Sequence, residues 1–212
     1  MRTDRESVVK AGLKLLNEKG LEGLTLRGIA AELGVKAPSL YWRFKSKQDL
    51  VDDMATSVLA DLAAELGQAD VGDWREISLR FGIALRRSLL KYRDGARMVG
   101  GSHMNDHSMY GPMERALEIF QAAGISPADA AVCLGSVNSY VIGFTLEEQA
   151  VLSPEGERDP RYALDRREER MDATRFPLSR SIGPELFDGY DARFERGLRA
   201  IVAGFAAEFA SA

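Results

Sequence analysis

Residues 25–47, TLRGIAAELGVKAPSLYWRFKSK, constrain the fold of this 212-residue chain more than any other stretch. Thr25 is suited to cap the N-terminus of a short helix, and apolar residues follow it at helical spacing. Gly34 then permits a tight turn. Pro38 stands near the start of a second short helix, where its missing N–H costs nothing. The stretch therefore predicts two short helices joined by a sharp turn.

The second of these helices presents polar, aromatic and basic side chains on one face. Leu40 and Phe44, four residues apart, are expected to face inward and hold the helix on its scaffold. A helix that enters the major groove of DNA needs donors and flat or small groups close to its N-terminus. The candidate DNA-binding residues are Thr25, Arg27, Ala37, Pro38, Ser39, Tyr41, Trp42, Arg43 and Lys47.

The chemistry of these side chains suggests their roles. Arg43 and Arg27 can donate to a base edge or to a phosphate, and Ala37 can touch a thymine methyl group. Tyr41 and Lys47 suit phosphates. The alternative is that the aromatic residues belong to the core and the lysines are merely solvated. The spacing, the glycine turn and the basic run coincide, and together they favour DNA contact.

Charge is divided unevenly along the chain. Residues 1–50 hold ten Lys/Arg and six Asp/Glu, net +4, whereas the remainder holds 18 and 26, net −8. A basic N-terminal part followed by an acidic remainder indicates that a polyanionic partner binds the N-terminal part alone. Cys133 is the single cysteine, which excludes an internal disulfide and fits a reducing compartment. With no leader and no run of 18 apolar residues, a cytoplasmic protein without membrane contact is predicted.

The rest of the chain shows helical periodicity, and no segment alternates as a strand does over a useful length. The chain is therefore predicted to be all-α. Further helices are predicted at about 48–66, 74–92, 112–123, 127–151 and 187–209. Residues 153–187 are charged and contain four prolines, so they are predicted to form a long mobile loop with at most a short helix.

Residues 5–53 resemble the DNA-binding domain of the tetracycline-repressor (TetR) family, whose signature is matched by LTLRGIAAELGV-x-x-PSLYWRFKSKQDL. More loosely, YRDGARMVGG, GFTLEEQ at 143–149 and the final helix resemble the family's regulatory domain. The resemblance implies a three-helix helix-turn-helix domain at 1–47 and a helical ligand-binding and dimerisation domain at 48–212. It implies a homodimeric repressor that binds a pseudo-palindromic double-stranded DNA operator and is released by a small-molecule inducer.

The resemblance also implies a ligand site. Family members that bind tetracycline hold a drug–magnesium chelate with two histidines and a glutamate. In a loose alignment Ala63 and Val99 take the places of the histidines, and only Glu147 matches. A hydrophobic or polycyclic inducer is therefore predicted instead of the chelate, in an adaptable, methionine-rich site. The predicted lining, whose alternative is simple core packing, is Phe81, Leu85, Met98, Val99, Met104, Met109, Met113, Val137, Tyr140 and Glu147.

Other functions are weaker on the sequence. His103 and His107 would share a helical face beside Asp106, but no third ligand stands at a fixed spacing, so neither a metal nor a cofactor is predicted. A helical enzyme that uses Glu147 with a histidine would lack a nucleophile motif and a phosphate loop. An architectural DNA-binding protein without a ligand would not need the large acidic part that follows residue 50.

Overall fold

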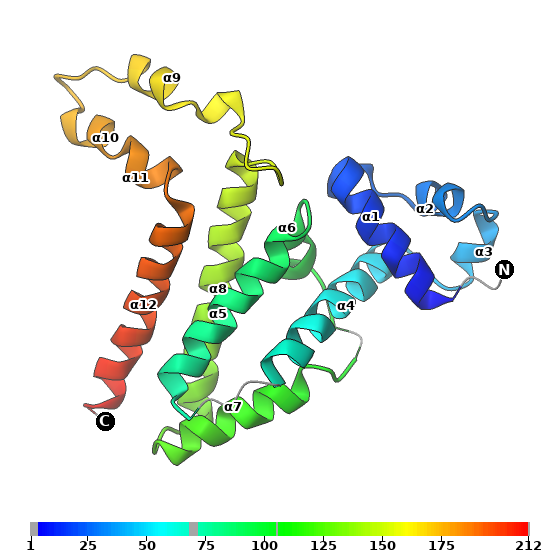
Figure 1. The fold of residues 1–212 in the computed structure, drawn as a ribbon, viewed down its shortest axis with the longest axis horizontal. Coiled ribbons are helices and arrows are strands. Elements are labelled where there is room, and N and C mark those ends of the chain that lie inside the picture. Colours follow the sequence, from blue (N-terminus) through cyan, green and yellow to red (C-terminus); the bar gives the residue numbers. More distant parts are fainter. Residues whose placement is uncertain (1–3, 68–71, 105, 212) are drawn as a thin grey trace.

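The computed structural model describes residues 4–67, 72–104 and 106–211, and the regular elements in these ranges are all helices (Figure 1). This confirms the all-α prediction. The bounds are α1 Arg5–Gly23, α2 Leu26–Glu32, α3 Pro38–Tyr41, α4 Lys47–Gly67, α5 Trp74–Leu90, α6 Gly95–Gly100, α7 Tyr110–Ala122, α8 Pro127–Val151, the 3-10 helix η1 Pro160–Tyr162, α9 Leu164–Glu169, α10 Pro177–Ser181, α11 Gly183–Phe187 and α12 Tyr190–Phe209.

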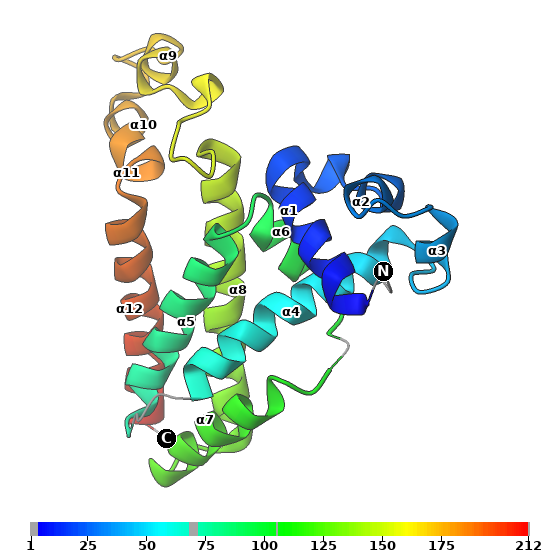
Figure 2. The same cartoon turned by 45° about the vertical axis from the view of Figure 1, so that its right-hand side comes forward.

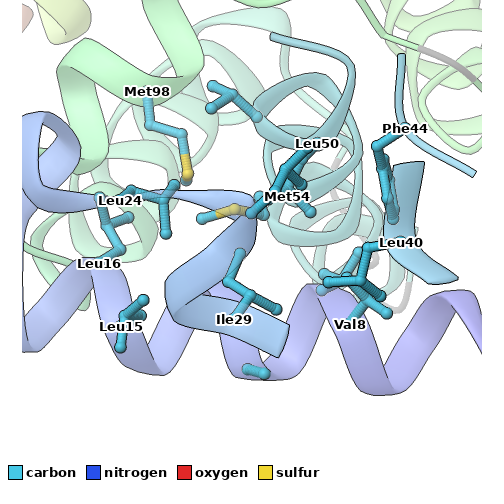
Figure 3. Close-up of a cluster of buried hydrophobic side chains, with 14 of the residues drawn as sticks. Val8, Leu15, Leu16, Leu24, Ile29, Leu40, Phe44, Leu50, Met54 and Met98 are labelled. Atoms are coloured by element: carbon cyan, nitrogen blue, oxygen red, sulfur yellow. The ribbon is translucent and has the colours of Figure 1, made fainter. Parts of the chain in front are cut away.

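The first three helices form a small unit, the head, beside the start of α4 (Figures 1 and 2). α1 begins where the Asp4 carboxylate accepts the N–H of Ser7 at 2.8 Å. α2 begins where the Thr25 hydroxyl oxygen accepts the N–H of Gly28 at 3.0 Å, as predicted. Each side chain satisfies one of the free N–H groups of a helix N-terminus. Apolar side chains from α1 to α4 fill the head core (Figure 3), the largest being Leu16, Leu24, Ile29, Leu40, Phe44, Leu50 and Met54.

α4 contributes to two cores. Ser46 and Asp49 cap its start reciprocally, since the N–H of Asp49 donates to the Ser46 hydroxyl at 3.1 Å. Leu50 and Met54, in its first half, pack in the head core, whereas Leu62 belongs to the core of the remaining helices. A boundary at residues 47 and 48 stays a prediction, and the helix that follows it is shared by both parts.

The second core belongs to the body, in which α5, α8 and α12 pack together and α7 closes one end (Figure 2). The residues of α5 that pack inward lie at helical spacing, as predicted, and include Leu85 and Leu89. Aromatic rings fill the space between the helices. Trp74 lies 5.2 Å from Phe120 and 5.3 Å from Phe209, measured between ring centroids.

Two regions outside the head differ from the sequence-based expectation. Residues 95–100 form α6, where no helix was predicted. Residues 152–189, called the arm below, contain η1, α9, α10 and α11, so the prediction of a loop with at most one short helix is wrong. The reason is that Pro160, Pro177 and Pro184 each stand in the first turn of a helix, where proline is favoured.

α8 is an unusually apolar helix. Among the described residues it is the one helix long and apolar enough to cross a membrane, with a mean hydropathy of 1.2 over 18 residues. It packs against α5, α6, α7 and α12, as the core helix of a helical protein does. Only 28% of that window is buried within one chain. Its uncovered face therefore needs another apolar surface.

Candidate functional site

The turn between α2 and α3 has the geometry that the sequence predicts. Gly34 has φ of 65°, in the left-handed region that favours glycine. The backbone then reverses, and the N–H of Val35 donates to the carbonyl of Ala30 at 2.9 Å. Leu40 and Phe44 are each 1% exposed in the head core. They anchor α3 and the turn after it by their inner side, as predicted, and fix which side chains face outward.

α3 ends at Tyr41, so Trp42 and Arg43, which were expected on the helix, lie in the turn that follows it. The outer side of α3 and this turn is aromatic and exposed. Trp42 is 91% exposed and Tyr41 50% exposed, so neither is a core aromatic residue. Single exposed apolar residues are common, but two adjacent exposed aromatic side chains form a candidate interaction surface. Most of the candidate set is exposed: Thr25, Arg27, Pro38, Ser39, Tyr41, Trp42, Arg43 and Lys47.

Two candidates are engaged in the head itself. Ala37 is half-buried and packs against the head core. Lys47 is exposed, but its ammonium donates to the backbone carbonyl of Leu21 at 2.5 Å. Sequence spacing could not show either contact, because both depend on how α1, α3 and α4 pack.

The basic residues of the head differ in whether their side chains form hydrogen bonds or salt bridges. No described residue forms a hydrogen bond or salt bridge with the side chain of Arg27, Lys36, Arg43 or Lys45. The basic residues of α1 differ, since Lys10 pairs with Glu6 at 2.7 Å and Lys14 pairs with Glu32. Arg43 interacts electrostatically with the Asp4 carboxylate but forms no salt bridge with it, so positive charge that is only partly compensated lies next in sequence to the exposed aromatic residues, where phosphates would bind.

The predicted ligand-binding residues are only partly brought together. Leu85 and Val137 are buried in the body core, and Phe81, Val99 and Tyr140 pack against it. The remaining residues lie elsewhere. Met98 is buried in the head core, Met104 and Met109 are half-buried in the segment before α7, and Met113 and Glu147 are exposed.

Tyr140 is occupied by α12. Its hydroxyl donates to the carbonyl of Phe194 at 3.1 Å, and its ring stacks on that of Phe194. A side chain at Gly197 would come within 2.2 Å of the Tyr140 hydroxyl oxygen, so this close approach requires glycine. Tyr140 therefore fixes α8 against α12.

A buried charged cluster stands beside Glu147, and the sequence analysis missed it. Glu148 is 5% exposed and accepts two hydrogen bonds from Arg86, at 2.9 and 2.7 Å. Arg86 also contacts Asp191 at 2.8 Å and lies 4.8 Å from the centre of the Phe194 ring. The bidentate geometry stabilises both buried charges. The pair ties α5 to α8, and Asp191 adds α12.

Three hollows surround this cluster at the end of the body that carries the arm. The first lies between α5 and α12 and includes Arg86 and Phe194. The second lies beside the turn after α5 and includes Gln149, and the third lies at the start of α12 and includes Tyr190. No residue of the predicted ligand-binding set lines any of them.

The histidines and the cysteine do not form a metal site in the described part of the chain. No group of three or more His, Cys, Asp or Glu residues is placed to hold a metal ion there. The His107 ring stacks on Tyr110, with 5.0 Å between the ring centroids. Cys133 is buried in the body core, and burial raises the pKa of its thiol.

Comparisons with known proteins cover almost the whole chain. Residues 8–54 match the family model "Bacterial regulatory proteins, tetR family", and residues 66–209 match "Tetracyclin repressor-like, C-terminal domain". The chain is 37% identical over 202 residues to the class A tetracycline repressor protein of Escherichia coli transposon 1721, covering 94% of this chain and 89% of that protein. Identity to the class C repressor of Escherichia coli is 36% over 210 residues, covering 96% and 90%. These relatives are transcriptional regulators.

Solved structures agree with these matches. A possible TetR family regulator from Streptomyces coelicolor superimposes with a TM-score of 0.83 at 37% identity, covering 96% of this chain and 99% of that one. ActR of Streptomyces coelicolor, in complex with (S)-DNPA, gives a TM-score of 0.78 at 27% identity, covering 98% and 99%. BioQ of Mycobacterium smegmatis, with its double-stranded DNA operator, gives 0.64 at 28%, covering 97% and 99%.

Proposed function

The chain belongs to the TetR family of bacterial regulatory proteins, and from that premise we propose which residues contact DNA and which class of compound releases it. As a member, it is a dimeric, DNA-binding transcriptional repressor that responds to a small molecule. The proposal is that α3 reads the operator and that a hydrophobic or polycyclic inducer, not a tetracycline–magnesium chelate, lowers DNA affinity.

The observation that carries the DNA assignment is the exposed Trp42 beside the exposed Arg43. We assign base-edge contacts to Arg43 and Ser39, because short polar and guanidinium donors on such a helix reach bases in the major groove. Tyr41 and Trp42 would pack on the sugar–phosphate backbone. Phosphate contacts are assigned to Thr25, and base or phosphate contacts to Arg27, with Pro38, Ala37 and Lys47 at the edge of the interface.

The uncovered face of α8 supports the arrangement of the dimer. Val132 is 60% exposed and Leu146 is 45% exposed, although both are apolar. Small residues, Gly135 and Gly143, stand exposed between them and permit a close approach of another helix. We propose that α8 and α12 of two copies pack together there. Two heads on a two-fold axis would then read the two halves of a pseudo-palindromic operator.

The proposed inducer class is based on the residues that stand where tetracycline-binding family members have histidine ligands. Ala63 is buried and Val99 is half-buried, so the two positions aligned with histidines are apolar. Apolar walls of Phe81, Leu85 and Val137, which lie in or against the body core, would bind a flat hydrophobic compound. We further propose that the protein is cytoplasmic and has no enzymatic role, as its regulator relatives suggest.

An inducer lowers the affinity of the protein for DNA when it binds better to the conformation in which the two heads do not fit the operator. DNA lowers the affinity of the protein for the inducer by the same factor. A coupling free energy of about 1–3 kcal/mol is sufficient for a response of severalfold to a hundredfold. α4, which has one half in each core, is the proposed connection between the ligand site and the head.

The test is selection of operator DNA from a random pool, followed by release assays with two probes. One probe is tetracycline with Mg²⁺, and the other is a panel of flat polycyclic aromatic compounds without chelating groups. Release by members of the panel, unchanged in Glu147→Gln, is expected. Release by the magnesium chelate at comparable concentrations, lost in Glu147→Gln, would overturn the inducer proposal. Absence of any sequence preference would overturn the DNA assignment.

A further inference from the structure

The hollow between α5 and α12 brings a buried guanidinium to the edge of an open space. The two helices pack side by side (Figures 1 and 2). The space between the C-terminal half of α5 and the first turns of α12, called the α5–α12 hollow below, has a volume of about 450 Å³. Arg86, whose side chain is 11% exposed, lines it together with Phe194. Small-molecule sites have volumes of about 300–1,000 Å³, so the hollow is large enough for a small ligand.

Arg86 keeps a donor that the protein does not use. Its Nε and Nη2 atoms donate to the Glu148 carboxylate at 2.9 and 2.7 Å, and Nη2 also lies 2.8 Å from Oδ1 of Asp191. No described residue accepts a hydrogen bond from Nη1 of Arg86. Nη1 is not closed off from solvent, because the buried polar atoms without a partner in the described ranges are Thr145 Oγ1 and Arg193 Nε. A guanidinium nitrogen is therefore available to an anion in the hollow.

Asp191 holds a place on Arg86 that a ligand could take. The Asp191 side chain is 90% exposed, whereas that of Glu148 is 7% exposed. An exposed carboxylate gains little from an ion pair, because water solvates it almost as well. The carboxylate of a ligand can therefore replace Asp191 while the buried Arg86–Glu148 pair stays intact.

The other charges around the α5–α12 hollow favour an anion. Lys91 lines it and is exposed, and no described residue forms a hydrogen bond or salt bridge with its ammonium group. Arg87 and Glu195 also line it, but Arg87 pairs with Glu65 and Glu195 pairs with Arg199. The one lining charge left without a partner among the described residues is therefore positive.

The hollow also has an apolar wall. Ile83, Leu90 and Phe194 line it, and Ile83 is 41% exposed although it is apolar. The α5 side of this wall lies outside the proposed interface of α8 and α12, so it remains accessible in the dimer. A ligand for this hollow thus needs a negative group at one end and an apolar body.

We infer that the α5–α12 hollow is a second ligand site, which binds an amphipathic monocarboxylate with a flat apolar body. The ligand carboxylate accepts hydrogen bonds from Nη1 of Arg86 and from Lys91, and it competes with Asp191 for the guanidinium. The apolar body packs on Ile83, Leu90 and the Phe194 ring. This site is separate from the proposed inducer site, and its occupation requires neither DNA nor inducer.

Calorimetric titration of the full-length protein with two probes of the same shape tests the ligand class. The probes are 2-naphthoate and the uncharged 2-naphthamide. We expect saturable binding of 2-naphthoate with a Kd of about 1 mM or tighter. The amide should bind at least about tenfold more weakly, because it lacks the charge that pairs with Arg86 and Lys91. Equal affinities, or no saturable binding of 2-naphthoate up to about 10 mM, would overturn the inference.

Asp191→Asn gives the most specific test, because the inference predicts a gain. The change removes the carboxylate that competes for Arg86, so 2-naphthoate should bind about threefold to tenfold more tightly. Glu208→Gln removes an exposed carboxylate near the other end of α12 and is the matched control, expected to leave the affinity unchanged. Unchanged or weaker binding to Asp191→Asn would contradict the competition and overturn the inference.

Two changes on α5 locate the ligand. Lys91→Gln should weaken 2-naphthoate binding about twofold to fivefold, whereas Arg80→Gln, on the same helix but paired with Glu76 outside the hollow, should not. A loss as large in Arg80→Gln would show that net charge alone attracts the anion, and the site would be refuted.

Ile83→Trp fills the hollow from its exposed wall and should weaken binding at least about tenfold. Thermal unfolding close to that of the parent protein shows that each variant is folded. Binding to Ile83→Trp as tight as to the parent would place 2-naphthoate elsewhere, for example in the inducer site, and would rule out the α5–α12 hollow. None of these titrations contains DNA, so their outcome is independent of the proposed function.

Discussion

The head and the body of this repressor place their functional residues by different means. In the head, Leu40 and Phe44 are buried four residues apart, and this local pairing fixes which side chains of α3 and of the turn after it face outward. In the body, the apolar residues proposed to line the ligand site come from helices far apart in sequence and belong to the core. A surface that reads DNA can therefore follow from one helix, whereas a ligand site depends on how several helices pack.

The first prediction removes an anchor of the head. Phe44→Ala should destabilise the head by about 3–5 kcal/mol, because it deletes a fully buried ring from a small core. Specific DNA binding should be lost while the body still dimerises, as measured by denaturant unfolding, operator binding and sedimentation.

Trp42→Ala is the matched control for that change. Its ring is 91% exposed, so the free energy of unfolding should change by less than about 0.5 kcal/mol while DNA affinity still falls. If Trp42→Ala unfolded the head as Phe44→Ala does, the assignment of inner and outer faces to α3 would be wrong.

The second prediction concerns the charged cluster of the body. Glu148→Ala should destabilise the dimer by about 3 kcal/mol, at the low end for breaking a buried ion pair, because Asp191 still accompanies Arg86. Glu147→Ala, one residue away and exposed, should change stability by less than about 0.5 kcal/mol. Urea unfolding at a fixed protein concentration measures both, and equal effects would show that the register of α8 is different.

The third prediction has the smallest expected effect on stability. Thr25→Ala removes the cap of α2 and should cost about 1 kcal/mol of stability. Thr25→Ser keeps the hydroxyl oxygen and should restore that stability. If Thr25 also contacts a phosphate, Thr25→Ala should weaken binding to all DNA sequences equally, whereas a loss confined to one sequence would contradict a phosphate role.

The sequence was sufficient where local signals determine structure. The cap at Thr25, the turn at Gly34 and the anchors of α3 follow from residue types and spacing, and the structure has all three. The arm was misjudged because proline favours both loops and the first turn of a helix. Only the packing of the neighbouring short helices distinguishes the two.

The body shows what the sequence could not supply. α8 is apolar on most of its faces, so its pattern did not show that Glu148 is buried with Arg86 while Glu147 faces outward. Met98 looked like a ligand contact, yet it packs in the head core because α6 docks there. Both outcomes depend on contacts between helices distant in sequence, which periodicity does not encode.

The central claim is that the outer side of α3 and of the turn after it reads the operator, and Arg43→Ala tests it most directly. Operator sequences selected by the parent protein and by this variant should differ at one base pair, repeated symmetrically in both half-sites. Discrimination there should fall by about 1–3 kcal/mol. An unchanged sequence preference with undiminished affinity would contradict the claim, because Arg43 would then lie outside the DNA interface.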